Sequence, residues 1–159
     1  MKMILAPILF LIVGISLVGF FLYLVKNPLT TGKKEPDNQI TSVCLKEKCF
    51  AVELATTPVQ QARGLMGREK LDNNKGMLFV FQKEGIYPFW MKDTLIPLDM
   101  IWIDSNNKIV FISQNAQPCK SLICPQINPG VNAMYVLEIN SGISEELDLQ
   151  LGDKCDIIS

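Results

Sequence analysis

The chain has 159 residues, with 15 Lys and Arg against 16 Asp and Glu, a formal net charge of −1 and no histidine. A nearly neutral chain without a basic patch excludes the usual nucleic-acid-binding proteins, because phosphate binding needs clustered Lys and Arg. The lack of histidine excludes Ser-His-Asp and Cys-His catalysis and imidazole metal sites, and we expect no metal and no cofactor.

The amino-terminal segment is strongly apolar. Residues 3–25 carry no charged side chain, and as a helix they would be about 34 Å long, enough to cross a bilayer core of roughly 30 Å. A cleaved secretory signal is the alternative, but its apolar stretch is shorter and ends in small residues, whereas residues 20–25 are bulky. We therefore expect a single-pass signal anchor at residues 1–25, a polar linker at 26–38 and one domain at 39–159.

The domain is predicted to be mainly β. Short segments that are apolar or alternating, bounded by Gly, Pro, Asn or Asp, are typical of strands. They occur at residues 40–44, 49–55, 77–81, 98–103, 108–113, 133–139 and 154–158. The stretch from Thr57 to Gln60 fits a helix capping box with proline at the first helical position, and Gly64 or Gly67 would end this helix. About seven strands and one short helix predict a sandwich or barrel-like fold.

The five cysteines form two pairs and a remainder. Cys44 and Cys49 have four residues between them, as do Cys119 and Cys124. The first pair flanks a predicted four-residue hairpin loop, across which the two sulfurs would face each other. Two local disulfides are the favoured interpretation, and a four-thiolate zinc site and free thiols are the alternatives. Cys155 is expected to be a buried apolar residue of the last strand.

The orientation of the anchor follows from the cysteines. Lys2 precedes the apolar segment and Lys26, Lys33 and Lys34 follow it, so the positive-inside rule leaves the topology open. Disulfides require an oxidising compartment. The sequence therefore predicts a cytoplasmic amino terminus and an extracytoplasmic carboxyl-terminal domain.

Several motifs between residues 49 and 158 resemble a known family. The most specific is Phe89-Trp90-Met91-Lys92-Asp93-Thr94 followed by Pro97-Leu98-Asp99. The others are Val52-Glu53-Leu54-Ala55, Arg63-Gly64-Leu65-Met66, Arg68, Gly76-Met77-Leu78-Phe79, Val136-Leu137-Glu138 and Leu151-Gly152-Asp153. In these motifs the chain is similar to the domain-of-unknown-function 192 family of uncharacterised, often exported prokaryotic proteins. The resemblance implies a β-rich, sandwich-like domain and no established activity, with Arg63, Lys92 and Asp99 as signature positions.

Asp99 is the most suggestive single residue. In a strand at residues 98–103 it shares a face with Ile101 and Ile103, and a carboxylate among apolar neighbours needs a partner. An ion pair with Arg63, Arg68 or Lys92 that fastens the helix to the sheet is favoured over a catalytic or ligand-binding acid. Two other strand acids, Glu53 and Glu138, are expected to face solvent.

Aromatic and sulfur-containing side chains suggest two further sites. Trp90 could be buried, or it could line an exposed groove in which an aromatic face stacks on a sugar or peptide. Four methionines could bind copper(I) through their sulfurs, but they are spread over separate segments and core packing is the better interpretation. These are Met66, Met77, Met91 and Met100.

Taken together, these features favour a membrane-anchored, extracytoplasmic binding or accessory module for a small polar, sugar or peptide ligand. Its candidate ligand-binding residues are Arg63, Trp90, Lys92 and Asp99. One alternative is a hydrolase or transferase that uses Asp99 with Lys92 or Arg63. A purely structural envelope protein is the second alternative.

Overall fold

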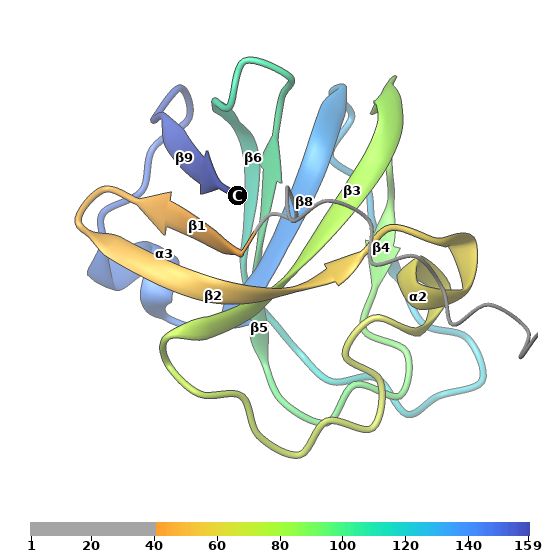
Figure 1. Cartoon of the computed structure of the whole chain (residues 1–159). Helices are drawn as coiled ribbons and strands as arrows, with labels where there is room; N and C mark the ends of the chain where they lie inside the picture. The colour runs from red at the N-terminus through yellow and green to blue at the C-terminus, as the bar shows by residue number, and fades with distance from the viewer. Residues whose placement is uncertain (1–40) are drawn as a thin grey trace, which may run out of the picture. The chain divides into compact units, whose positions relative to one another are not determined.

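A seven-stranded sheet that curls into a half-barrel dominates the computed structural model, which describes residues 41–159 (Figure 1). Its strands, in spatial order, are β6 (Ile109–Ala116), β5 (Leu98–Ile103), β8 (Ala133–Asn140), β3 (Lys75–Gly85), β2 (Lys48–Ala55), β1 (Ser42–Leu45) and β9 (Cys155–Ile158). Neighbours are antiparallel except β2 and β3, which are parallel. A separate small sheet joins β4 (Phe89–Trp90) to β7 (Gln126–Ile127). The helices of the described part are α2 (Pro58–Arg63) and α3 (Ile143–Glu146).

The mainly β prediction is confirmed, and each predicted strand has a counterpart in the large sheet. Because one sheet curls on itself, the barrel-like alternative describes the fold better than a sandwich of two facing sheets. The short strands β4 and β7 were not predicted. The first hairpin is also tighter than expected, because Leu45 pairs with Lys48 and leaves only Lys46 and Glu47 in the turn.

Helix α2 begins and ends as its sequence predicts. The Thr57 side chain accepts a hydrogen bond from the Gln60 backbone amide, and the Gln60 side chain accepts one from the Thr57 amide, which completes the capping box. Pro58 occupies the first helical position. The helix ends at Gly64, whose φ of +47° is a conformation that glycine adopts most readily. The helix lies on the connection between the parallel strands β2 and β3.

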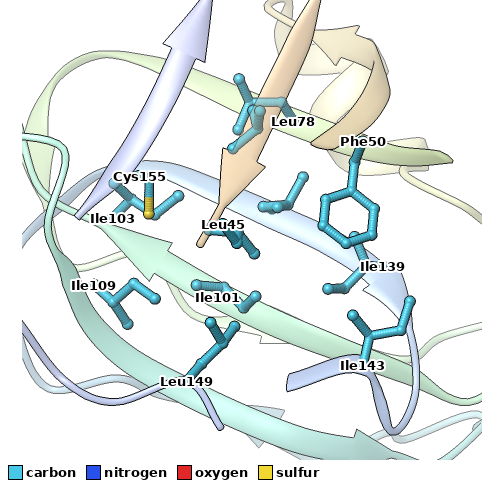
Figure 2. Close-up of a cluster of buried hydrophobic side chains, with 12 residues drawn as sticks. Leu45, Phe50, Leu78, Ile101, Ile103, Ile109, Ile139, Ile143, Leu149 and Cys155 are labelled. Carbon is cyan, nitrogen blue, oxygen red and sulfur yellow. The ribbon is translucent and has the colours of Figure 1, made fainter. Parts of the chain in front are cut away.

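One face of the sheet carries the first core cluster, shown in Figure 2. It contains alternate residues of β1, β5, β8 and β3, together with apolar side chains from the segment around α3. The fully buried members include Leu45, Phe50, Leu78, Ile101 and Leu137. Full burial of one such side chain contributes about 1.5 to 3 kcal/mol, so this cluster is a principal source of stability.

The opposite face carries the second core cluster, which includes Met77, Phe79, Leu98, Met100 and Trp102. Aromatic rings meet edge-on across it, with ring centroids 4.7 Å apart for Phe79 and Phe89 and 5.5 Å apart for Phe89 and Trp102. The connections after α2 and after β4 contribute buried side chains to the same cluster. These connections therefore cover the second face and shape the site described below.

The predicted anchor at residues 1–25 and the linker at 26–38 lie outside the described residues, and both stay predictions. Between residues 41 and 159, no helix is both long and apolar enough to cross a bilayer.

Candidate ligand-binding site

Glu138 is a buried acid on the second face of the sheet. It lies in the central strand β8, opposite Met77 of β3 and Met100 of β5, and only 4% of the residue is exposed. Its Oε2 atom has no hydrogen-bond partner within residues 41–159. Buried polar atoms are nearly always paired, and an unpaired one costs about 1 to 3 kcal/mol. The fold thus maintains an unsatisfied carboxyl oxygen in apolar surroundings. The prediction that Glu138 faces solvent is wrong.

The protonation of Glu138 follows from its burial. Loss of water contact raises the pKa of this carboxyl to about 8, because an apolar environment disfavours the charged form. Over the described part of the chain, no cation forms an ion pair with it. At neutral pH the group is therefore mostly protonated, and it can donate one hydrogen bond as well as accept.

A small cavity lies over Glu138. Its volume is about 20 Å³, and a single water-sized group needs roughly 10 to 15 Å³. Gly64 keeps this space open, because a Cβ atom there would lie 3.8 Å from Oε2 of Glu138 and 3.2 Å from the ring of Phe79. The cavity can therefore admit one oxygen- or nitrogen-sized group of a ligand next to the unpaired acid.

Three of the four predicted ligand-binding residues line this cavity. Arg63 is the last residue of α2, Trp90 is the last of β4, and Lys92 follows two residues later. Trp90 is 47% exposed, so it lies at the surface rather than in the core. The Lys92 ammonium donates to the backbone oxygen of Ser121 and lies 3.2 Å from a carboxylate oxygen of Asp93. The mouth of the cavity thus combines an exposed aromatic ring with two cations.

Asp99 lies on the other face of the sheet and does not line this cavity. It is fully buried, and its Oδ1 accepts a hydrogen bond of 2.8 Å from the Asn115 amide. Its Oδ2 accepts bonds from the amide (2.8 Å) and hydroxyl (2.7 Å) of Ser144. The N-cap residue of helix α3 is Gly142, which has no side chain to cap the helix, so Asp99 caps it from strand β5. The predicted ion pair to a cation is wrong, because these three donors already satisfy the carboxylate.

The sequence contains a signal for Glu138 that its solvent-facing interpretation overlooked. Glu138 follows Val136 and Leu137, which lie on opposite faces of the strand, and a strand that is apolar on both faces is typical of the centre of a covered sheet. The other strand acid behaves as expected: Glu53 is exposed and forms a 2.8 Å ion pair with Arg68.

Both predicted disulfides are confirmed. The sulfurs are 2.00 Å apart in Cys44–Cys49 and 2.06 Å apart in Cys119–Cys124. Since these four sulfurs are bonded in pairs, the zinc and free-thiol alternatives are wrong. Cys155 is buried in β9 as predicted, and burial raises the pKa of its thiol to about 12, which makes it a poor nucleophile at neutral pH.

Core packing accounts for three of the four methionines, whereas Met66 is partly buried and lines the cavity over Glu138. Met77, Met91 and Met100 all belong to the second core cluster. Within residues 41–159, no group of three or more Cys, Asp or Glu side chains could hold a metal ion.

The comparisons with known proteins agree with the fold and give no established activity. The model of the DUF192 family, described as an uncharacterised conserved region, matches residues 41–157. A protein of unknown function from Novosphingobium aromaticivorans DSM 12444 is 32% identical, with a TM-score of 0.68, over 78% of this chain and 89% of that one. A proposed transcription regulator from Sinorhizobium meliloti 1021 is 35% identical, with a TM-score of 0.66, over 72% and 89%.

Among curated proteins, none matches the chain significantly. The family match spans nearly the whole of the described part, and both solved structures share its fold. The chain therefore belongs to the DUF192 family.

Proposed function

We propose that this protein is a membrane-anchored, extracytoplasmic binding module that takes a polar group of a small, sugar or peptide ligand into the cavity over Glu138. The observation that carries the proposal is the buried, unpaired Oε2 atom of Glu138 beside a cavity of water-molecule size. A ligand oxygen or nitrogen in that space would satisfy the carboxyl group. Ligand binding would thereby remove the free-energy cost of leaving this atom without a hydrogen bond.

The surroundings of the cavity support a ligand rather than a purely structural role. Trp90 is half exposed at the mouth, where an aromatic face can stack on a ligand. Arg63 and Lys92 lie at the same mouth and supply donors and positive charge. A concave site with a few converging polar groups is the usual form of a binding pocket.

Catalysis has less support from the geometry. The hydrolase or transferase alternative depended on Asp99, but its oxygens are occupied by Ser144 and Asn115 on the other face of the sheet. Glu138 is the one carboxyl group among the residues that line the cavity. General acid–base chemistry of the glycosidase type uses two carboxyl groups roughly 5 to 10 Å apart. Binding therefore has the stronger basis.

The disulfides and the sequence support the proposed location of the module. Two disulfides within one domain fit an oxidising compartment. The apolar segment at residues 3–25 would attach the chain to the membrane. A membrane-impermeant thiol reagent added to intact cells should label Cys44, Cys49, Cys119 and Cys124 only after reduction. Labelling of these cysteines only after cell lysis would refute the extracytoplasmic topology.

The binding proposal is tested by thermal unfolding of the full-length protein in detergent with a panel of monosaccharides, disaccharides, amino acids and capped dipeptides. We expect at least one class of compound to raise the melting temperature of the wild type and of Glu47→Gln, which changes an exposed turn residue. The same compound should have no effect on Glu138→Leu, which removes both hydrogen-bonding atoms. An equal shift in Glu138→Leu, or no shift with any compound, would leave the structural envelope role as the better account.

A further inference from the structure

A second hollow adjoins the cavity over Glu138. Its volume is about 220 Å³, an order of magnitude larger than the 20 Å³ of the cavity itself. Five aromatic rings form most of its wall, those of Phe79, Phe81, Tyr87, Phe89 and Trp90. Pockets that bind drug-sized ligands have volumes of roughly 300 to 1,000 Å³, so this smaller hollow suits a single ring or a branched side chain.

The hollow offers few hydrogen bonds to a ligand. The Gln61 side-chain amide already donates to the backbone oxygens of Val80 (2.9 Å) and Ala55 (3.3 Å). The Tyr87 hydroxyl already donates to the Lys83 backbone oxygen at 2.7 Å. A sugar ring carries several hydroxyl groups that need partners, whereas an apolar group needs none. The hollow therefore favours an aromatic or branched aliphatic group.

The hollow and the cavity are neighbouring compartments of one site. Phe79, Phe89 and Trp90 line both of them. A ligand whose apolar group fills the hollow can therefore extend a polar atom toward Glu138 past the shared aromatic wall. The site consequently distinguishes the two ends of its ligand.

The charge around the cavity favours an anion as the polar end. Arg68 is paired with Glu53, and Lys92 is paired with Asp93. Arg63 lines the cavity and makes no ion pair or side-chain hydrogen bond with any of residues 41–159. An uncompensated guanidinium is a preferred partner for a carboxylate.

We propose that the site binds a carboxylate attached to an aromatic ring or a branched aliphatic group, with this apolar group in the aromatic hollow and the carboxylate between Glu138 and Arg63. This inference rests on the proposed binding function and names its ligand class. Protonated Glu138 donates a hydrogen bond to one ligand oxygen, so the two carboxyl groups share one proton, and Arg63 neutralises the remaining negative charge. The same chemistry is present at the carboxyl terminus of a peptide that ends in an aromatic residue and in a free aryl acid.

Matched probes test the ligand class. Isothermal titration of the full-length protein in detergent at pH 6 would compare N-acetyl-glycyl-phenylalanine with its carboxyl-terminal amide, and with 3-phenylpropionate. We expect the acid to bind at least roughly tenfold more tightly than the amide, because a charge-assisted hydrogen bond contributes about 1.5 to 3 kcal/mol. Tighter binding of the peptide than of 3-phenylpropionate would identify a peptide terminus as the source, and equal binding would identify a small acid.

Variants connect the affinity to named residues. Arg63→Gln should weaken binding of the peptide acid at least roughly tenfold and leave binding of the amide unchanged. Arg68→Gln is the matched control and should change neither affinity. Glu138→Gln keeps a donor and cannot ionise, so it should bind the acid equally at pH 6 and pH 9. The wild type should lose roughly tenfold in affinity at pH 9, one unit above the pKa of about 8. The charged groups that line the cavity besides Glu138 are Arg63 and Lys92.

Two results would overturn the inference, and they differ in what they mean for the binding function. If acid and amide bind equally and Glu138→Leu or Trp90→Ala abolishes both, the site is a binding site but not one for carboxylates. If neither peptide nor 3-phenylpropionate binds, the ligand class is wrong, and the wider panel decides whether the binding function itself stands.

Discussion

Replacement of Glu138 by glutamine should change the pH dependence of stability in a defined direction. The pKa of this carboxyl is raised from an ordinary value of 4.5 to about 8 in the folded protein. Between these pH values the folded chain binds one more proton than the unfolded chain, so the free energy of unfolding falls as the pH rises. The stability that this group contributes is fully present below about pH 4.5 and is lost as the pH approaches 8. Glutamine cannot titrate and removes this dependence.

The magnitude follows from the size of the shift. Each pH unit between the two pKa values changes the free energy of unfolding by about 1.4 kcal/mol. From pH 5 to pH 7 the wild type should therefore lose about 3 kcal/mol relative to Glu138→Gln. Other carboxyl groups titrate in both proteins, so their contribution cancels in the difference.

Urea denaturation of the full-length proteins under non-reducing conditions at pH 5, 6 and 7 would measure this difference. Glu47→Gln is the control, and its difference from the wild type should stay within about 0.5 kcal/mol at every pH because the side chain is exposed. A difference between the wild type and Glu138→Gln that is constant from pH 5 to pH 7 would refute a buried, protonated Glu138.

Three further substitutions test other parts of the structure. Asp99→Asn should lower the free energy of unfolding by about 2 to 4 kcal/mol, since an amide nitrogen would replace an oxygen that accepts hydrogen bonds from donors such as Ser144. A melting temperature within a degree of the wild type would contradict the capping role of Asp99. Trp90→Ala should change stability by less than about 1 kcal/mol because the ring is half exposed, yet abolish binding of N-acetyl-glycyl-phenylalanine, and a large loss of stability would show that the ring is structural. Replacing Cys44 and Cys49 together by serine should cost about 2 kcal/mol in urea denaturation, the chain-entropy value for so short a loop, and an unchanged midpoint would argue against that bridge as a stabilising element.

The sequence was a good guide to the secondary structure. Strands such as β5 and β8 carry long apolar or β-branched runs, and the capping box at Thr57 and Gln60 contains both halves of its hydrogen-bond exchange within four residues. Strands β4 and β7 have two residues each and form by pairing with each other across the fold, so no local sequence pattern predicts them. The turn of the first hairpin has fewer residues than predicted, because the register of the two strands also depends on how they pair.

The site was only partly predictable for a related reason. The sequence predicts Arg63, Trp90 and Lys92 as ligand-binding residues, and the fold brings them to one cavity. The acid was assigned to Asp99 instead of Glu138, although both lie in central strands among apolar residues. The two acids differ in whether the fold places hydrogen-bond donors next to them. Asp99 has hydrogen bonds from segments that follow it by 16 and 45 residues, whereas the Oε2 atom of Glu138 lies near Gly64, which has no side chain to donate one. Such partners belong to the tertiary structure and have no local sequence signal.

The most direct test of the account is a carbon-13 NMR titration of the Glu138 side-chain carboxyl in the full-length protein, with Glu138→Gln used to assign the signal. We expect a midpoint near pH 8, and a shift of this signal when N-acetyl-glycyl-phenylalanine is added at pH 6. A midpoint near the ordinary value of 4.5, with no response to the peptide, would contradict both the unpaired buried acid and the ligand site built on it.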